Sequence, residues 1–311
     1  MLLKENIPVS YVFGKIKKEL ILVAVYSASI YFIHQYYNFK AVSIPLTVST
    51  MLGTIISLLL AFRSNQAYDR WWEARTLWGA IVNDSRTLTR QILTFVDSSN
   101  HDGEQKWALK ERIIRRQMAW CYSLSCHLRG QNAKENLEAY LSDDDVKTIK
   151  KMDHVPLALN ELQGHDLRTL HKLGWINEYQ QVALDSTLTG FTNSMGGCER
   201  IKNTVFPVTY SVYIHLLVLF FVLLLPFSLM EFFGIFQVPL VIAISSAFFL
   251  IEKMAIHLQD PFENKPTDTP TTTISRTIEN NLKQMMKDEL PADINAMINK
   301  QPQKQPAFYI L

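Results

Sequence analysis

Few residues in this sequence have the types and spacing that catalytic chemistry needs. Cys121 is followed by Cys126 and His127, which weakly resembles zinc-ligand spacing, but no second pair of ligands follows nearby in the chain. The sequence contains no phosphate-binding glycine loop, no dinucleotide fingerprint, no Ser-His-Asp set and no catalytic carboxylate pair. It therefore predicts a protein that is not an enzyme and that has no metal site and no cofactor.

Charge and cysteine content exclude further classes. The net charge is only +2, which predicts no nucleic-acid partner. Three cysteines, with Cys198 interpreted as a packing residue, suit a reducing compartment better than a disulfide framework. The acidic run at 142–145 is interpreted as a helix cap in preference to a cation site, because Ser is a favoured first residue before a helix.

A more informative pattern is a row of hydroxyl side chains in an otherwise apolar stretch, 41–62. They recur every three or four residues and therefore share one helical face: Thr47, Thr50, Thr54 and Ser57. One interpretation is close helix packing assisted by Gly53 and Ala61. The other is a face directed at water in a pore. Periodicity alone does not choose between them.

An apolar row overlaps this face. Thr54, Leu58 and Phe62 lie four residues apart and form a line along the helix. In a ring of identical copies, such a line would make a narrow hydrophobic collar.

These positions require membrane-spanning elements. About 20 helical residues cross the hydrocarbon core of a bilayer. Four apolar runs are candidates, joined in pairs by short loops: 19–37 with 41–62, and 207–230 with 235–251. Lys and Arg flank the outer ends of both pairs, so the termini and the polar middle are predicted to be cytoplasmic. His215, in the third run, is expected either inside the bundle or near the interface.

The stretch 61–80 places Arg63 and Arg70 among Trp71, Trp72 and Trp78. Tryptophan collects at membrane interfaces, and Asp69 and Glu73 are spaced to pair with nearby arginines. No proline or capping signal interrupts the helical pattern before about residue 98, so one helix is predicted to run from the membrane into the cytoplasm.

The polar middle has helical periodicity throughout. The predicted fold is all-α, with four transmembrane helices in two hairpins that continue into a helical cytoplasmic region. The predicted segments are 1–18 (cytoplasmic), 19–62 (first hairpin), 63–206 (cytoplasmic helices), 207–251 (second hairpin) and 252–311 (cytoplasmic C-terminal segment and tail).

Three segments, 62–91, 195–210 and 259–282, resemble the hallmark blocks of the bestrophins, and the bacterial bestrophin-like branch is the most similar. The resemblance spans nearly the whole chain. It implies an ion channel of five identical subunits around one axial pore, located in the inner (plasma) membrane. Self-association, the lipid bilayer and small monovalent ions are the partners it implies.

The resemblance also assigns positions. The family's pore neck falls on Thr54, Leu58 and Phe62, although Thr54 departs from the bulky apolar residue that is usual there. A second, cytoplasmic constriction is carried over to Ile176, with Tyr179 as the second choice. Within 195–210, Gly196 and Gly197 are expected to allow close backbone approach, and Pro207 is expected in the first turn of the third apolar helix.

Selectivity and gating remain open at this level. Chloride conduction is favoured by the family majority, whereas a bacterial relative conducts monovalent cations. A non-conducting membrane scaffold and a membrane enzyme are further alternatives. Eukaryotic members bind calcium through an unbroken acidic run after the fourth helix. Here Asp260, Glu263 and Asp268 are interrupted by Lys265, so no calcium clasp of that type is expected.

Overall fold

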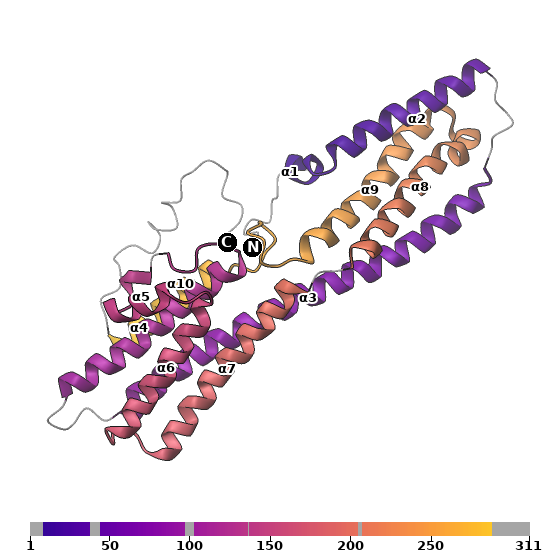
Figure 1. Ribbon diagram of the computed structural model, residues 1–311. Coiled ribbons are helices and arrows are strands. Elements are labelled where there is room, and N and C mark those ends of the chain that lie inside the picture. The colour runs from indigo at the N-terminus through magenta and orange to yellow at the C-terminus, as the bar shows by residue number, and fades with distance from the viewer. Residues whose placement is uncertain (1–8, 38–43, 97–102, 136, 205–206, 288–311) are drawn as a thin grey trace. The chain divides into compact units, whose positions relative to one another are not determined.

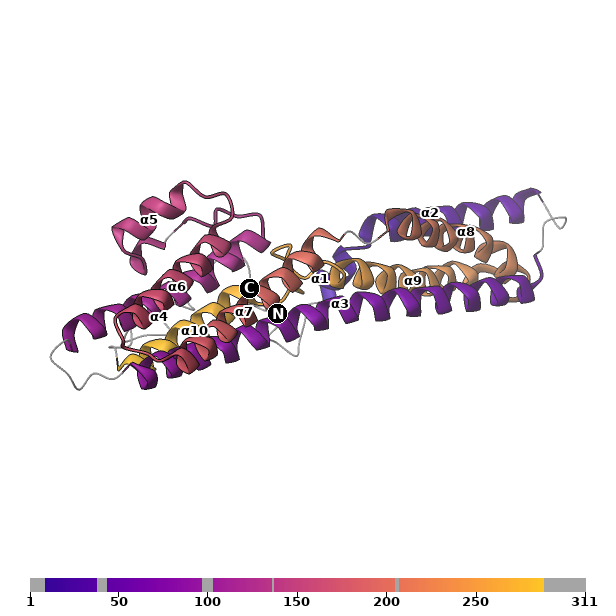
Figure 2. The same cartoon turned by 60° about the horizontal axis from the view of Figure 1, so that its bottom comes forward.

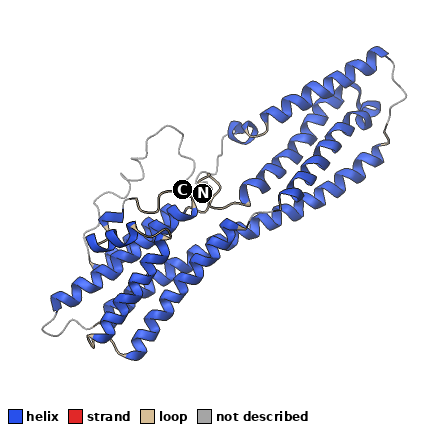
Figure 3. Cartoon of the chain, in the orientation of Figure 1, coloured by secondary structure: helices blue, strands red, loops and turns tan. Residues whose placement is uncertain are grey.

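The computed structural model describes residues 9–37, 44–96, 103–135, 137–204 and 207–287 (Figure 1). In these ranges every regular element is a helix, as the all-α prediction requires (Figure 3). The α-helices are α1 (Val9–Gly14), α2 (Lys17–Tyr37), α3 (Leu46–Phe95), α4 (Gly103–Leu128), α5 (Asp143–Lys150), α6 (Val155–Lys172), α7 (Glu178–Asn203), α8 (Val208–Phe233), α9 (Gln237–Leu258) and α10 (Thr271–Met286). Two short 3₁₀ turns, η1 (Leu137–Ala139) and η2 (Gly234–Phe236), complete the set. The predicted loop at 38–40 and the tail after 287 lie outside the described residues.

Helix α3 is one uninterrupted helix of 50 residues, which confirms the predicted continuity through the Arg/Trp stretch. It begins directly after Pro45 and contains no proline. At about 1.5 Å per residue such a helix is about 75 Å long, more than twice a bilayer's hydrocarbon core. The chain divides into two compact units, and the division falls on α3 between Trp71 and Trp72.

The apolar unit consists of Lys4–Trp71 and Val205–Asp260. Helices α2, α8, α9 and the first part of α3 lie side by side in it (Figures 1 and 2). Its core includes Ile56, Leu60, Val218, Phe221 and Phe249. Two stretches of the described residues, Leu46–Phe95 and Val208–Leu258, are long and apolar enough to cross a membrane. Four separate spans in two hairpins stay a prediction.

The polar unit contains Trp72–Thr204 and the chain from Pro261 onward. Its core is built by the second part of α3 with α4, α6, α7 and α10, and it includes Trp78, Trp120 and Phe191. The Trp120 and Phe191 rings are 5.1 Å apart between centroids. The hydroxyl oxygen of Ser142 accepts a hydrogen bond from the backbone N–H of Asp145 at 3.3 Å. The acidic run therefore caps α5, as predicted.

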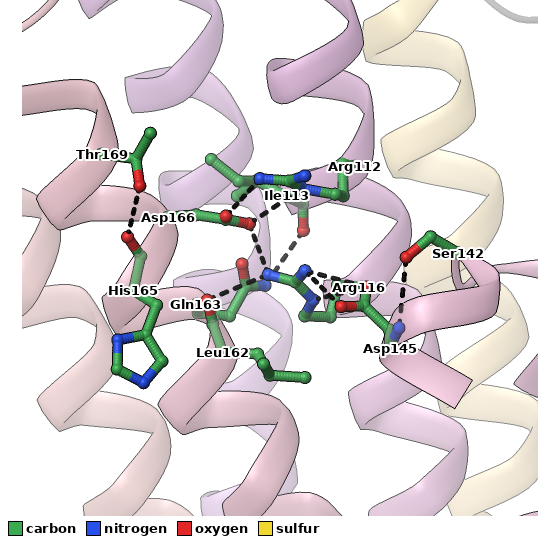
Figure 4. Close-up of polar contacts among 10 residues, drawn as sticks. All are labelled: Arg112, Ile113, Arg116, Ser142, Asp145, Leu162, Gln163, His165, Asp166 and Thr169. Carbon is green, nitrogen blue, oxygen red and sulfur yellow. Dashed lines mark hydrogen bonds and ion pairs between the residues drawn. The ribbon is translucent and has the colours of Figure 1, made fainter. Parts of the chain in front are cut away.

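A buried arginine joins three helices of the polar unit (Figure 4). The guanidinium of Arg116, on α4, donates to the carboxylate of Asp145 on α5, at 2.8 Å, and to that of Asp166 on α6. It also donates to the backbone carbonyl of Leu162 at 3.0 Å. Arg112 donates to the same Asp166 carboxylate. Such a buried cluster positions α5 against α4 and α6, because removing Arg116 would leave the Asp145 carboxylate unpaired in a desolvated site.

Candidate pore-lining site

The predicted neck positions lie on the surface of the isolated chain. Leu58 is 58% exposed and Phe62 is 55% exposed, and Thr54 is also exposed. Large apolar side chains at this exposure need lipid or another protein surface to cover them. The structure therefore leaves all three available to a neighbouring copy of the chain.

The opposite face of α3 forms the packed side. Its buried residues recur at helical spacing: Ser49, Ile56, Leu60, Arg63 and Ala67. The Ser49 and Ser228 hydroxyls are 2.6 Å apart in a buried contact between α3 and α8. A Cβ atom on Gly53 would lie 3.3 Å from the Phe221 ring, so this glycine is where α8 comes close. Packing within the chain thus uses this face and not the hydroxyl row.

The hydroxyl row itself is exposed, and three of its four members donate hydrogen bonds within α3. The hydroxyls of Thr50 and Thr54 donate to the carbonyls of Leu46 and Thr50, each at 2.9 Å. The hydroxyl of Ser57 donates to the carbonyl of Gly53 at 2.7 Å. Each donor is therefore occupied, but each oxygen can still accept a hydrogen bond from water. The interpretation of the row as a packing face therefore does not hold inside the chain. The other interpretation, a face directed at water in a pore, stays a prediction.

Charged side chains form a cluster directly after the apolar stretch 41–62, where α3 contacts α8 and α9. Arg63 is 1% exposed, and its guanidinium donates to the Ser211 hydroxyl on α8 at 2.9 Å. It lies 3.9 Å from the carboxylate of Glu252 on α9. Nδ1 of His215, on α8, is 3.1 Å from the same carboxylate. Arg63 therefore points into the helix bundle and does not snorkel outward. His215 contacts the same buried carboxylate with a side chain that is 43% exposed, so the choice between its two expected positions stays a prediction.

Sequence reasoning missed Glu252 and Ser211. A signal was present, because Glu252 is an acidic residue directly after a long apolar run, where an ionisable side chain is costly unless it is paired. The sequence does not say that its partners come from α3 and α8, which are far away along the chain.

The rest of the Arg/Trp stretch is only partly interfacial. The Arg70 guanidinium donates to the Gln259 carbonyl at 2.8 Å and lies 3.9 Å from the Asp260 carboxylate. Trp72 is 54% exposed and Trp71 is partly exposed, which suits an interface. The interfacial interpretation of Trp78 was wrong, since it is fully buried in the core of the polar unit.

The predicted local pairing of Glu73 also needs correction. Glu73 forms its ion pair with Arg200 on α7, and not with an arginine on its own helix. Both side chains are substantially exposed, so the pair adds little stability.

The two candidates for the second constriction differ in burial. Ile176 is 4% exposed and belongs to the core of the polar unit, which is an unsuitable place for a side chain that narrows a pore. Tyr179, in the first turn of α7, is 88% exposed. Tyr179 is therefore the candidate that offers its side chain to a neighbouring molecule.

Gly196 and Gly197 differ in how closely other atoms approach them. A Cβ atom on Gly197 would lie 2.9 Å from Cδ1 of Leu77, which is too close for an unshifted structure, and this confirms the expected close approach. Gly196 has no atom within 4 Å of such a Cβ atom, so its predicted close approach is wrong within the chain. Pro207 is the N-cap of α8, one position before the predicted first turn.

The acidic residues after α9 have separate partners. The Glu263 carboxylate accepts from Nζ of Lys202 at 2.6 Å, and this bond lowers the pKa of Glu263. Asp268 is 1% exposed and accepts from the backbone N–H of Lys265 at 3.0 Å. Burial raises the pKa of Asp268, against the lowering effect of backbone hydrogen bonds.

Two of the three cysteines behave as packing residues. Cys121 and Cys198 are buried, and burial raises the pKa of each thiol to about 12. Cys121 lies beside Ser85 and Gln117, within 3.9 and 3.7 Å of their polar atoms. A thiol with such a pKa is almost entirely protonated at neutral pH and is a poor metal ligand.

Comparison with known proteins identifies the family of the chain. A model of the bacterial/fungal bestrophin family matches residues 6–284. A voltage-dependent anion channel-forming protein of Nostoc is 32% identical over 258 residues, which is 83% of this chain and 82% of that protein. The voltage-dependent anion channel-forming protein YneE of Escherichia coli is 29% identical over 257 residues, with the same shares of the two chains.

Solved structures give the same result. The crystal structure of a bestrophin homologue from Klebsiella pneumoniae superimposes with a TM-score of 0.82 and 26% sequence identity. The match covers 88% of this chain and all of that chain. The family model spans the exposed row on α3 and every described helix except the last residues of α10. On these grounds the chain is a membrane protein and belongs to the bacterial and fungal branch of the bestrophin family.

Proposed function

We propose that this protein is a passive ion channel, built from five identical copies that surround one axial pore. The observation that carries the proposal is the exposed row Thr54, Leu58 and Phe62 on α3. An assembly that turns this face inward brings the two large apolar side chains of each copy next to those of its neighbours around the axis. The same assembly stacks the three residues as rings that narrow the pore.

The proposed neck selects by size and dehydration. The stretch 46–62 contains no charged residue, so its exposed face places no ring of charge in the pore. Leucine and phenylalanine cannot replace the hydration shell of an ion, so a narrow ring of them obstructs ions unless it widens. Exposed Tyr179 is proposed as the side chain of a second constriction, in place of buried Ile176.

The permeant ion is proposed to be chloride or a similar small anion. The support is that relatives from Nostoc and Escherichia coli are named voltage-dependent anion channel-forming proteins. Conduction of monovalent cations is the competing proposal, because an apolar neck does not discriminate by sign. A non-conducting scaffold is the second alternative. We further propose the inner membrane as its location, with both termini in the cytoplasm.

One experiment separates these proposals. The purified protein is reconstituted in planar bilayers, and the reversal potential is measured across an asymmetric potassium chloride gradient. An anion channel reverses near the chloride equilibrium potential and a cation channel near that of potassium. Replacement of chloride by a large organic anion should abolish one direction of current only in the first case. Absence of current from bilayers that contain inserted protein would favour the scaffold.

A further inference from the structure

Two histidines and a glutamate from three different helices meet in the polar unit. His127 lies in the last turn of α4, His154 is the N-cap of α6, and Glu199 lies near the end of α7. One ligand atom of each residue lies within 4.8 Å of the other two. The three residues are far apart in sequence, and the packing of α4, α6 and α7 brings them together (Figures 1 and 2).

The distances are close to those of a metal-ligand set. Nε2 of His127 is 3.5 Å from Oε1 of Glu199, and Nε2 of His154 is 2.7 Å from the same oxygen. The two imidazole rings are 4.5 Å apart between centroids. Tetrahedral zinc with bonds of about 2.0–2.2 Å separates its ligand atoms by roughly 3.4 Å. One separation already fits this geometry, and the His154–Glu199 hydrogen bond has to open by less than about 1 Å.

The surroundings allow an ion to enter and the ligands to bind it. Each histidine side chain is 33% exposed and Glu199 is 23% exposed. A neutral imidazole at pH 7 has a lone pair for coordination. Two imidazoles and one carboxylate form a set that zinc and similar divalent transition metals bind well.

We propose that His127, His154 and Glu199 form a binding site for one divalent transition-metal ion per chain, with zinc as the best-fitting ion. Three protein ligands occupy three corners of a tetrahedron, and the fourth corner is left to water. The ion would join the end of α4, the start of α6 and the end of α7. This proposal does not depend on ion conduction by the protein.

Metal binding has a specific local cost. Nδ1 of His154 accepts the backbone N–H of Leu157 at 3.1 Å, so in the neutral ring the proton is on Nε2, where it donates to Glu199. A metal at Nε2 requires the other neutral tautomer, in which the proton is on Nδ1. With the proton on Nδ1, the ring can no longer cap α6. Loss of one cap is a small cost compared with metal coordination.

The same contact provides a clean variant. Asparagine is among the best N-cap residues, so His154→Asn can keep the cap of α6 while it removes the imidazole. Glu199→Gln keeps the shape and removes the charge, and His127→Gln removes the third ligand. The matched control is His165→Gln on α6, because His165 faces Glu161 at 3.8 Å as an exposed helical pair.

The test uses the full chain in detergent, without an affinity tag, titrated with zinc by calorimetry and with cobalt by visible absorption. We expect about one zinc per chain and a tetrahedral cobalt spectrum. Each of the three variants should weaken binding more than about 100-fold, since loss of an outer-shell partner alone costs 10–100-fold. His165→Gln should bind as the parent does. Zinc should also raise the thermal midpoint of the parent and control proteins, but not of the three variants.

Several results would overturn the proposal. These are the absence of stoichiometric uptake by the parent, parental affinity in any of the three variants, or an equal loss of affinity in His165→Gln. Size-exclusion profiles identify variants that do not fold. The variants that do fold then test the metal site. Because the readouts are heat, absorption and thermal midpoint, failure here leaves the channel proposal unaffected, and failure of conduction leaves the metal site unaffected.

Discussion

At the residue scale, the exposed row on α3 leads to the most direct prediction. Leu58→Ala and Phe62→Ala should each raise conductance or open probability, because a smaller apolar ring obstructs hydrated ions less. Thr54→Ala should have little effect, since its hydroxyl already donates to the Thr50 carbonyl and only its oxygen remains for ions or water. Single-channel recording in planar bilayers measures these effects.

Leu60→Ala is the contrasting variant, because Leu60 is 1% exposed on the packed face of the same helix. It should cost about 2–5 kcal/mol of stability through an internal cavity without widening the neck. Size-exclusion profiles confirm assembly of each variant. If Leu58→Ala and Phe62→Ala assemble normally and conduct as the parent does, these residues do not form the gate.

A second prediction concerns calcium. Glu263 is paired with Lys202, Asp260 lies near Arg70, and Asp268 accepts a backbone N–H. Carboxylates that are already engaged with different partners are a poor oxygen cage for a hard cation. Ion flux should therefore be equal in a chelator and in micromolar calcium. Steep activation by calcium that disappears in Asp268→Asn would contradict this prediction.

At the element scale, the glycine pair of α7 offers a matched comparison. Gly197→Ala places a methyl group 2.9 Å from Leu77 and should destabilise the packing of α3 against α7 by about 1–3 kcal/mol. Gly196→Ala meets open space and should be neutral or stabilising by up to about 1 kcal/mol, because alanine favours helix over glycine. Thermal unfolding followed by circular dichroism in detergent measures both variants. Equal midpoints would show that Leu77 adjusts freely.

At the scale of the whole molecule, the exposed apolar surface predicts self-association. Beyond the neck residues, Val182 on α7 is 69% exposed, although α7 belongs to the polar unit, where lipid is not expected to cover it. Native mass spectrometry in a mild detergent should give five chains of 35.9 kDa each. A uniform population of monomers or dimers would remove the basis for a shared pore.

Much of the local structure could be predicted from the sequence, because local periodicity and end signals determine it. The uninterrupted α3, the cap at Ser142 and the single-face alignment of Thr54, Leu58 and Phe62 all follow from the spacing of apolar residues, prolines and capping side chains. The spacing of residues also divides α3 into two faces, and the structure shows which of these faces packs within the chain.

The partners of individual side chains were decided only by the tertiary structure. Arg63 finds Glu252 and Ser211, Trp78 enters a core, and Ile176 is buried. These outcomes depend on which helices pack together and on their rotation about their own axes, and spacing within one helix contains no such information. The meeting of His127, His154 and Glu199 has the same origin, because only the packing of three helices brings residues so distant in the sequence within coordination distance of one another.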